Sequence, residues 1–283
     1  PTAANIVHHA RIVKDKALLA ALIQKGTAVV GRAYADTDDV DEVLDWAEQQ
    51  IFEISQEKIS RSFVPVKNIL KGTFQLIETL YERKSHVTGV PTGFRKFDEM
   101  TAGLQPSDLV VVAGRPSMGK TSFALNIAQH AAVQERIPIA IFSLEMSKEQ
   151  LVQRMLCSVA KVDSHKLRTG FLSDSDWPKL TTGAGILSES PIFIDDTPGI
   201  SLLEMRAKAR RLKAEQGLGL VVIDYLQLVS GRGRAESRQQ EISEISRSLK
   251  AMAKELSVPV MALSQLSRRS EEHTSELQSP ECI

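Results

Sequence analysis

The chain has 283 residues with 35 basic and 35 acidic side chains, so its formal net charge is zero. This length allows one large domain or one domain with a smaller companion, and 42% apolar residues exclude wholesale disorder. The balanced charge gives no overall indication of nucleic-acid binding, so any such contact has to be local. The two cysteines, Cys157 and Cys282, match neither a disulfide framework nor a metal-binding pattern.

The sequence has no run of about 18 apolar residues and opens on no signal peptide. We therefore expect a cytoplasmic protein that makes no use of a membrane. The first residue is Pro1 rather than methionine, and the opening has the spacing of a helix interior. We expect a fragment of a longer chain.

The N-terminal part is predicted to be helical. Apolar residues recur with a helical period over 5–34 and again over 40–54, and the polar turn 35–39 between them predicts an antiparallel helical hairpin. A third pattern at 66–81 carries an apolar stripe that so few residues cannot bury alone. We expect this helix to dock on its own domain or on a neighbouring subunit, and we place the domain boundary near 84–87.

Beyond this boundary, strands and helices alternate. Near-continuous apolar runs indicate strands that are covered on both faces. The pattern predicts an α/β fold with a mostly parallel sheet, flanked by helices and joined by right-handed crossovers. The expected strands are 109–113, 139–144, 192–194, 220–223 and 258–263, and the expected helices are 122–135, 147–160, 201–216 and 238–256.

The stretch from Gly114 to Thr121 has the spacing G-x-x-x-x-G-K-T and lies between an expected strand and an expected helix. That context indicates a phosphate-binding loop, because glycines let backbone N–H groups approach phosphate oxygens and the helix N-terminus adds a positive dipole. Lys120 is then expected to reach the β- and γ-phosphates of ATP, and Thr121 to ligate Mg²⁺. The alternative is a surface turn before an ordinary helix. The residues assigned to the nucleotide are Gly114, Arg115, Pro116, Ser117, Met118, Gly119, Lys120, Thr121 and Ser122.

Three further polar residues end expected strands, and ligands of parallel sheets bind beyond those ends. Asp224 follows four apolar residues, as expected of an acidic residue that holds Mg²⁺ through water; a turn cap is its alternative. Glu145 ends a strand that we expect beside the phosphate-loop strand, where it could orient or deprotonate the attacking water. A glutamate favoured by the dipole of the following helix explains it equally well. Gln265 could sense the γ-phosphate or cap a turn.

Two other polar segments carry weaker indications. Residues 195–199 follow an expected strand, and an Asx-capped Pro-Gly turn explains them without a catalytic role, while Ser201 can cap the next helix. The loop 231–238 is basic, and Arg232, Arg234 and Arg238 suit contacts with nucleic-acid phosphates. A solvated charged loop is the more frequent explanation of such a pattern.

Five motifs follow one another along the chain: Gly89–Phe94, Gly114–Thr121, Ser143–Met146, Asp224–Leu228 and Leu263–Arg268. In this order they resemble the motifs of the bacterial replicative DNA helicases of the DnaB type. The resemblance implies a RecA-like ATPase domain in a homohexameric ring around single-stranded DNA, with 5′-to-3′ unwinding driven by ATP hydrolysis. It also matches Glu145 to the family's catalytic glutamate, and Gln265 to the residue that communicates the state of the γ-phosphate. Lys120 and Thr121 match the phosphate and Mg²⁺ residues, and Asp224 the second acidic motif.

The resemblance also divides the chain. It implies that 1–60 is the end of an N-terminal helical domain, 61–87 a linker-helix region that packs on the adjacent protomer, and 88–269 a RecA-like ATPase domain that is incomplete at its C-terminus. Primase and a helicase loader are the implied partners. Residues 270–283 resemble nothing in the family and have the character of a translated sequencing adapter, so we expect them to be non-native.

In the family, the motif around Leu263–Arg268 is followed by a DNA-contacting loop and an arginine finger, which this sequence does not show. An arginine finger contributes about 10³–10⁵ in rate in other nucleotide hydrolases. We therefore expect the 283-residue chain to be impaired in hydrolysis and unwinding. The alternatives are a RecA-like DNA-binding ATPase without helicase activity and a small-molecule kinase with a phosphate loop.

Overall fold

A computed structural model describes residues 3–35, 65–83, 87–228 and 238–266, together with residues 40, 43, 44, 46, 47, 50 and 51. Contacts within the chain divide it into two compact units, Pro1–Tyr81 and Glu82–Ile283. Each unit is described below by itself. Across the described residues, no helix is both long enough and apolar enough to cross a membrane.

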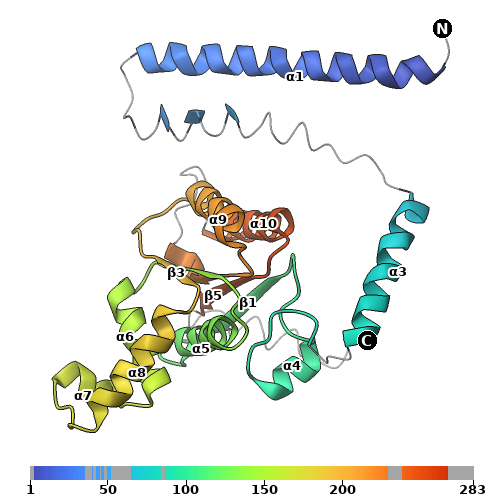
Figure 1. Cartoon of the computed structure of the whole chain (residues 1–283). Helices are drawn as coiled ribbons and strands as arrows, with labels where there is room; N and C mark the ends of the chain where they lie inside the picture. Colours follow the sequence, from blue (N-terminus) through green and yellow to red (C-terminus); the bar gives the residue numbers. More distant parts are fainter. Residues whose placement is uncertain are drawn as a thin grey trace, which may run out of the picture. The chain divides into compact units, whose positions relative to one another are not determined.

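The first unit contains the two long helices that the sequence predicts at its ends. Helix α1 (Ala3–Tyr34) corresponds to the pattern at 5–34, and α3 (Val66–Arg83) to the pattern at 66–81 (Figure 1). The stripe on α3 is exposed to solvent in the single chain. The second helix of the expected hairpin, at 40–54, lies largely outside the described residues. The exposed apolar side chains of α3 include Val66, Ile69, Leu70, Phe74, Ile77, Leu80 and Tyr81.

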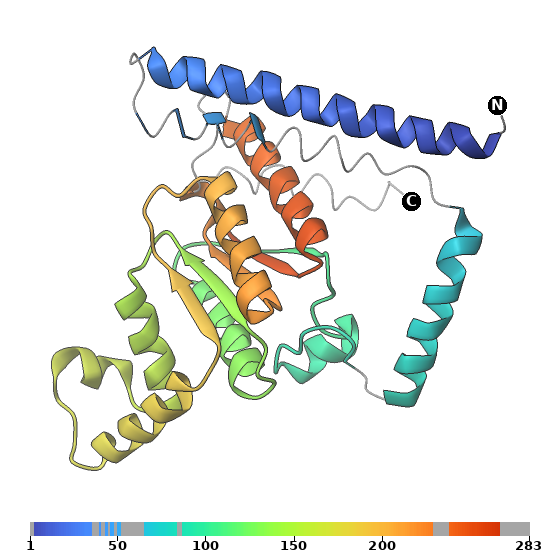
Figure 2. The same ribbon diagram turned by 45° about the horizontal axis from the view of Figure 1, so that its top comes forward.

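The second unit is a five-stranded sheet with helices on both faces (Figures 1 and 2). The strand order is β1-β5-β4-β2-β3, and all neighbouring strands are parallel, so the predicted α/β class is confirmed. In chain order the elements are α4 (Arg95–Thr101), β1 (Leu109–Gly114), α5 (Lys120–Val133), β2 (Ile139–Ser143), α6 (Lys148–Ala160), α7 (Ser164–Thr169), α8 (Asp176–Ser188), β3 (Ile192–Asp195), α9 (Leu202–Gln216), β4 (Leu220–Asp224), the 3₁₀ helix η1 (Leu226–Leu228), α10 (Arg238–Leu256) and β5 (Val260–Gln265).

The central strands are apolar throughout because both of their faces are covered. In β4, Val221 and Ile223 join a core cluster with α9 and α10, whereas Leu220 and Val222 join the opposite cluster with α5 and α6. Successive strand side chains point to opposite faces, so this alternation follows from strand geometry. Every residue of β2 and β4 is buried, which confirms the prediction made from their near-continuous apolar runs.

Several elements differ from the sequence-based expectation. Helices α4, α7 and α8 and the 3₁₀ helix η1 were not predicted, and β5 begins at Val260 rather than at residue 258. Helix α8 contains Pro178, Gly183 and Gly185, which weaken a helical signal. Pro178 lies in the first turn, where a proline is tolerated. Gly183 faces Ala160 and Leu156 of α6 closely, so the glycine permits the helices to pack.

The segment before β1 folds around the buried carboxylate of Asp98. Its oxygens accept hydrogen bonds from the Thr92 hydroxyl at 2.7 Å, from the Thr92 N–H at 3.0 Å and from the Gly93 N–H at 3.1 Å. The ring of Phe94 then stacks on Phe123 of α5, with centroids 4.9 Å apart. The Gly89–Phe94 motif therefore supports the helix that follows the phosphate loop.

Two glycines in this unit allow the cost of steric overlap to be distinguished from the cost of backbone strain when a glycine is replaced by alanine. Gly103 and Gly170 have similar positive φ angles, +81° and +77°. A Cβ at Gly103 would lie 2.8 Å from the Val90 carbonyl oxygen, whereas at Gly170 nothing lies within 4 Å. We expect Gly170→Ala to cost about 1 kcal/mol of unfolding free energy from backbone strain alone, and Gly103→Ala at least about 1 kcal/mol more. Urea unfolding measures both, and equal costs would contradict the steric assignment.

Candidate nucleotide-binding site

The parallel sheet brings the predicted polar residues to one edge. Strand register places Gly114 opposite Gln265, and Ser143 opposite Asp224. The carboxyl ends of β1, β5, β4 and β2 therefore lie in a row, with Glu145 just beyond Ser143. This row is the position in which ligands of open parallel sheets bind.

The phosphate loop has the backbone form that its sequence predicts. Ser117 and Gly119 have positive φ angles of 63° and 84°, and α5 begins at Lys120 with no side-chain cap. The first N–H groups of α5 are therefore not used by a capping side chain, and they add to the positive end of the helix dipole. The Lys120 ammonium donates to the Arg115 carbonyl oxygen at 3.0 Å, across the loop. A cavity of about 510 Å³ adjoins this loop, lined in part by Gly114, Gly119 and Lys120.

Thr121 and Asp224, which are 103 residues apart in the chain, meet directly. The Thr121 hydroxyl donates to a carboxylate oxygen of Asp224 at 2.7 Å. Asp224 is 4% exposed. Burial raises the pKa of Asp224 above its ordinary value; the Thr121 hydrogen bond opposes that rise, while the charge of Glu145 adds to it and those of Lys120 and Arg154 reduce it.

These groups fit a magnesium nucleotide. A threonine hydroxyl and a carboxylate are oxygen ligands of the kind that Mg²⁺ takes, and Mg²⁺ completes its shell with water and phosphate oxygens. No cluster of three or more His, Cys, Asp or Glu side chains suited to a metal occurs among the described residues.

The expected position of Glu145 was wrong in one respect. Its strand β2 is not beside the phosphate-loop strand β1, because β5 and β4 lie between them. The charge of Glu145 nevertheless acts on Asp224, since the turn after β2 crosses the end of β4, where the Leu144 N–H donates to the Asp224 carbonyl oxygen at 2.7 Å. Glu145 precedes the helix cap Ser147 and so lies outside the first turn of α6, which contains Glu149.

Glu145 also borders a second, larger cavity of about 970 Å³ between α5, α6 and α7. Ser122, the last residue assigned to the nucleotide, and Arg154 line the same cavity. Arg154 was not predicted from the sequence as a site residue; the only signal for it is that an arginine lies on the helix that follows Glu145. Its charge lowers the pKa of Asp224, so it contributes to the electrostatics of the site.

Gln265 ends β5 as predicted, and its backbone is held by the side chain of Gln227, which was not predicted from the sequence as a site residue. The Gln227 amide donates to the Gln265 carbonyl oxygen at 3.0 Å and accepts from the Gln265 N–H at 3.3 Å. It also donates to the Ser264 hydroxyl oxygen at 3.0 Å. Gln227 belongs to the motif at 224–228, so its polarity within an apolar run was the signal.

The predicted nucleic-acid contacts lie beyond what the structure describes. Arg232 and Arg234 are outside the described residues, and Arg238 is the first residue of α10, with a side chain that is also outside them. The predicted turn at 195–199 does form, since the Thr197 N–H donates to an Asp195 oxygen at 2.9 Å. Ser201 caps α9 as expected, accepting from the Glu204 N–H at 3.2 Å.

Comparison with known sequences gives a consistent family. The model of the DnaB-like helicase C-terminal domain matches residues 89–281. The chain is 55% identical over 273 residues to the replicative DNA helicase DnaB of Geobacillus stearothermophilus, covering 96% of this chain and 60% of that protein. It is 54% identical over 269 residues to the replicative DNA helicase DnaC of Bacillus subtilis (strain 168), covering 95% and 59%. The chain thus spans about three fifths of these relatives.

Comparison with solved structures agrees. A DnaB-like replicative helicase, described together with its interactions with primase, matches with a TM-score of 0.75 and 32% identity, covering 96% of this chain and 62% of that one. A second solved structure, described as an ATPase domain, matches with a TM-score of 0.69 and 38% identity, covering 75% and 74%. The RecA-like fold is thereby confirmed. The family match includes most of 270–283, which lie outside the described residues, so a non-native origin of that segment stays a prediction.

The raised pKa of Asp224 predicts how Asp224→Asn changes stability in the absence of nucleotide. A carboxylate whose pKa is raised by folding contributes stability below its unfolded pKa of about 3.9, and that contribution is lost as the pH rises. We therefore expect the unfolding free energy of the wild type to fall relative to Asp224→Asn as the pH rises above about 4. Denaturant unfolding of both proteins at several pH values measures the difference. An unfolding free energy of the wild type that rises relative to that of Asp224→Asn as the pH rises would contradict a raised pKa of Asp224.

Proposed function

Since the chain belongs to the DnaB-like helicase family, we propose that it is the ATPase part of a replicative DNA helicase. It hydrolyses ATP to move along single-stranded DNA and to unwind duplex DNA at the replication fork. The observation that carries this proposal is the hydrogen bond between Thr121 and Asp224, which brings the phosphate loop and the second acidic motif into one site. The identity of 54–55% to two replicative helicases supports the same reaction.

The phosphate loop binds the nucleotide in this proposal. The ammonium of Lys120 neutralises β- and γ-phosphate charge, and backbone N–H groups of the phosphate loop and of the start of α5 approach the phosphate oxygens. The Thr121 hydroxyl would ligate Mg²⁺, and the Asp224 carboxylate would hold the ion through water. When bound, Mg²⁺ supplies the charge that offsets the cost of burying the Asp224 carboxylate and the negative charge of the phosphates.

Glu145 acts as the general base. Its carboxylate accepts a proton from the water that attacks the γ-phosphate, and its position beyond the ladder end of β2 leaves it exposed toward solvent. Gln265 lies at the end of β5, between β1, which leads into the phosphate loop, and β4, which ends at Asp224. There its side-chain amide can form a hydrogen bond with the γ-phosphate when that phosphate is present. The hydrogen bonds between the Gln227 side chain and the Gln265 backbone fix the position of the Gln265 side chain.

The partners follow the family. We propose a homohexamer in which the exposed apolar face of α3 packs on an adjacent protomer, because an apolar stripe of this size needs a partner surface. Single-stranded DNA runs through the ring, with Arg232, Arg234 and Arg238 as its proposed phosphate contacts. Primase is a proposed partner, since a similar helicase is described with its interactions with primase, and a helicase loader is another. The compartment is the cytoplasm.

Unwinding of a forked duplex tests the function directly. Because the chain spans about 60% of its relatives, the assay uses the product of the whole gene. We expect ATP-dependent strand separation, and we expect Lys120→Ala to weaken ATP binding by about 100-fold, since charged hydrogen bonds to the phosphates are lost. Lys179→Ala, an exposed lysine on α8, is the matched control. ATP hydrolysis that DNA stimulates without unwinding would favour the RecA-like alternative, and unchanged ATP affinity in Lys120→Ala would refute the site.

The role of Glu145 is tested by Glu145→Gln, which keeps the shape of the side chain and removes the base. We expect hydrolysis to fall by about 10²–10⁴-fold with ATP binding retained. Glu149→Gln is the control, because Glu149 lies in the first turn of α6 close to Glu145 in the chain. Single-turnover hydrolysis and equilibrium ATP binding give the two quantities. Equal rates in Glu145→Gln and the wild type would exclude Glu145 as the base.

A further inference from the structure

The turn that carries Glu145 is attached to the sheet on one side. The Leu144 N–H donates to the Asp224 carbonyl oxygen at 2.7 Å, which fixes the start of the turn against β4. Within the turn, the Ser143 hydroxyl donates to the Met146 carbonyl oxygen at 2.6 Å. These contacts fix the residues on either side of Glu145 but leave the exit of the turn, at the start of α6, to be held by something else.

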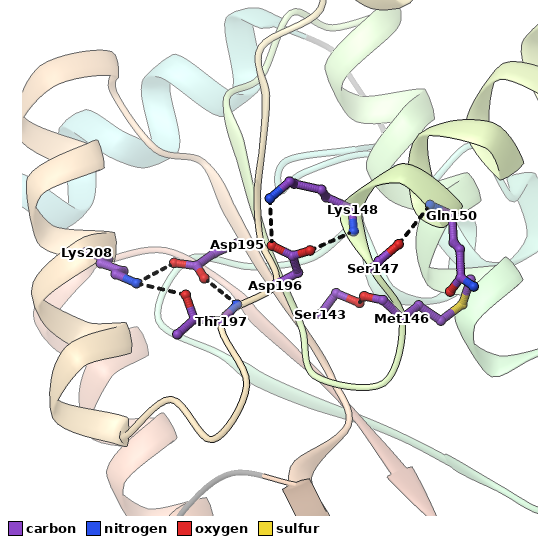
Figure 3. Close-up of polar contacts among 9 residues, drawn as sticks. All are labelled: Ser143, Met146, Ser147, Lys148, Gln150, Asp195, Asp196, Thr197 and Lys208. Atoms are coloured by element: carbon purple, nitrogen blue, oxygen red, sulfur yellow. Dashed lines mark hydrogen bonds and ion pairs between the residues drawn. The ribbon is translucent and has the colours of Figure 1, made fainter.

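Asp196 holds that exit from a different strand. It follows β3, and one of its carboxylate oxygens accepts the Lys148 N–H at 3.0 Å, while the other lies 3.4 Å from the Lys148 ammonium (Figure 3). The two residues are 48 positions apart in the sequence. The Lys148 N–H is also the first cause of the lowered pKa of Asp196, in agreement with the contact.

The carboxylate of Asp196 is itself held in place by its neighbour. Figure 3 shows Asp195 and Asp196 pointing to opposite sides of the chain. Asp195 pairs with the Lys208 ammonium of α9 at 2.7 Å and accepts the Thr197 N–H at 2.9 Å. These contacts hold the backbone on both sides of Asp196 to α9 and within the turn at 195–197. The Asp196 carboxylate therefore contacts α6 from a backbone that is held in place.

From this geometry we propose that Asp196 is a positioning residue for Glu145. It acts through the Lys148 N–H, and it fixes the end of the turn from which the Glu145 carboxylate reaches the attacking water. This inference rests on the proposed role of Glu145 as the base. Catalytic groups have to be held within about 0.5 Å of their productive position, and a displacement of 1 Å can cost about 100-fold in rate.

Helix capping alone does not account for the contact. Helix α6 already has a local cap, Ser147, whose hydroxyl oxygen accepts the Gln150 N–H at 3.4 Å. The ion pair to the Lys148 ammonium contributes little, because that side chain is 58% exposed. What Asp196 adds is a bond between the β2–α6 turn and the β3–α9 connection, which lie on neighbouring strands.

Three variants distinguish the hydrogen bond of Asp196 to the Lys148 N–H from its ion pair with the Lys148 ammonium. We expect Asp196→Ala to lower kcat for ATP hydrolysis by about tenfold or more, with the affinity for ATP unchanged, because the turn loses its outer attachment. Asp196→Asn retains an oxygen that can accept the Lys148 N–H, so we expect it to restore most of kcat. Lys148→Met removes the ammonium but keeps the N–H, so its kcat stays near that of the wild type.

Asp163→Ala is the matched control. Asp163 caps α7 in the same domain, accepting the His165 N–H at 2.7 Å, and it holds no part of the Glu145 turn. Asp163→Ala and Asp196→Ala each remove one hydrogen bond to the N-terminus of a helix, so we expect similar losses of stability. Thermal unfolding of both variants measures these losses. We expect kcat to fall only in Asp196→Ala. Equal slowing in both variants would overturn the inference, because a general loss of stability would then explain it.

A double variant distinguishes this inference from the proposed function. In the Glu145→Gln background, we expect Asp196→Ala to change the residual rate by less than about twofold, since the group that it positions is already lost. Wild-type kcat in Asp196→Ala beside a strongly impaired Glu145→Gln would overturn the positioning role and leave the role of Glu145 intact. Wild-type kcat in Glu145→Gln would overturn both.

Discussion

The hydrogen bond between Thr121 and Asp224 is the contact on which the site depends. It forms only because β5 separates β1 from β4 by one strand, so that the first turn of α5 reaches across β5 to the end of β4. Burying Asp224 is costly, and a single hydroxyl donor offsets part of that cost. The nearby charges of Lys120 and Arg154 offset more. The site therefore favours additional positive charge, which agrees with the proposed Mg²⁺.

The sequence was sufficient to predict the strands whose ends carry the proposed site residues. The phosphate loop and Asp224 each follow an apolar run directly, Gln265 follows one after Ser264, and parallel strands bring their carboxyl ends to one edge. The strands themselves were recognisable because both faces of β2 and β4 are buried, which requires apolar residues at every position. For these strands, the local run of apolar residues is enough to predict both the strand and the edge of the sheet at which it ends.

The sequence was insufficient wherever position depends on strand order or on a distant partner. Nothing in the pattern at 139–144 indicates that β4 and β5 separate β2 from β1, so the neighbour expected for the strand of Glu145 was wrong. An Asx turn explained both Asp195 and Asp196 locally, and for Asp195 that explanation holds. Asp196 instead bonds to a residue 48 positions away, and no local signal distinguishes the two carboxylates.

The strand ends are joined to one another by contacts beyond the ladder itself. The Leu266 N–H donates to the Gly114 carbonyl oxygen and so joins β5 to β1, and Gln227 joins the segment after β4 to β5. The Leu144 N–H joins β2 to β4, and Asp196 joins the segment after β3 to that after β2. These four contacts follow the strand order without a gap. The proposed site residues therefore lie on strand ends whose backbones are bonded to one another by contacts outside the sheet ladder.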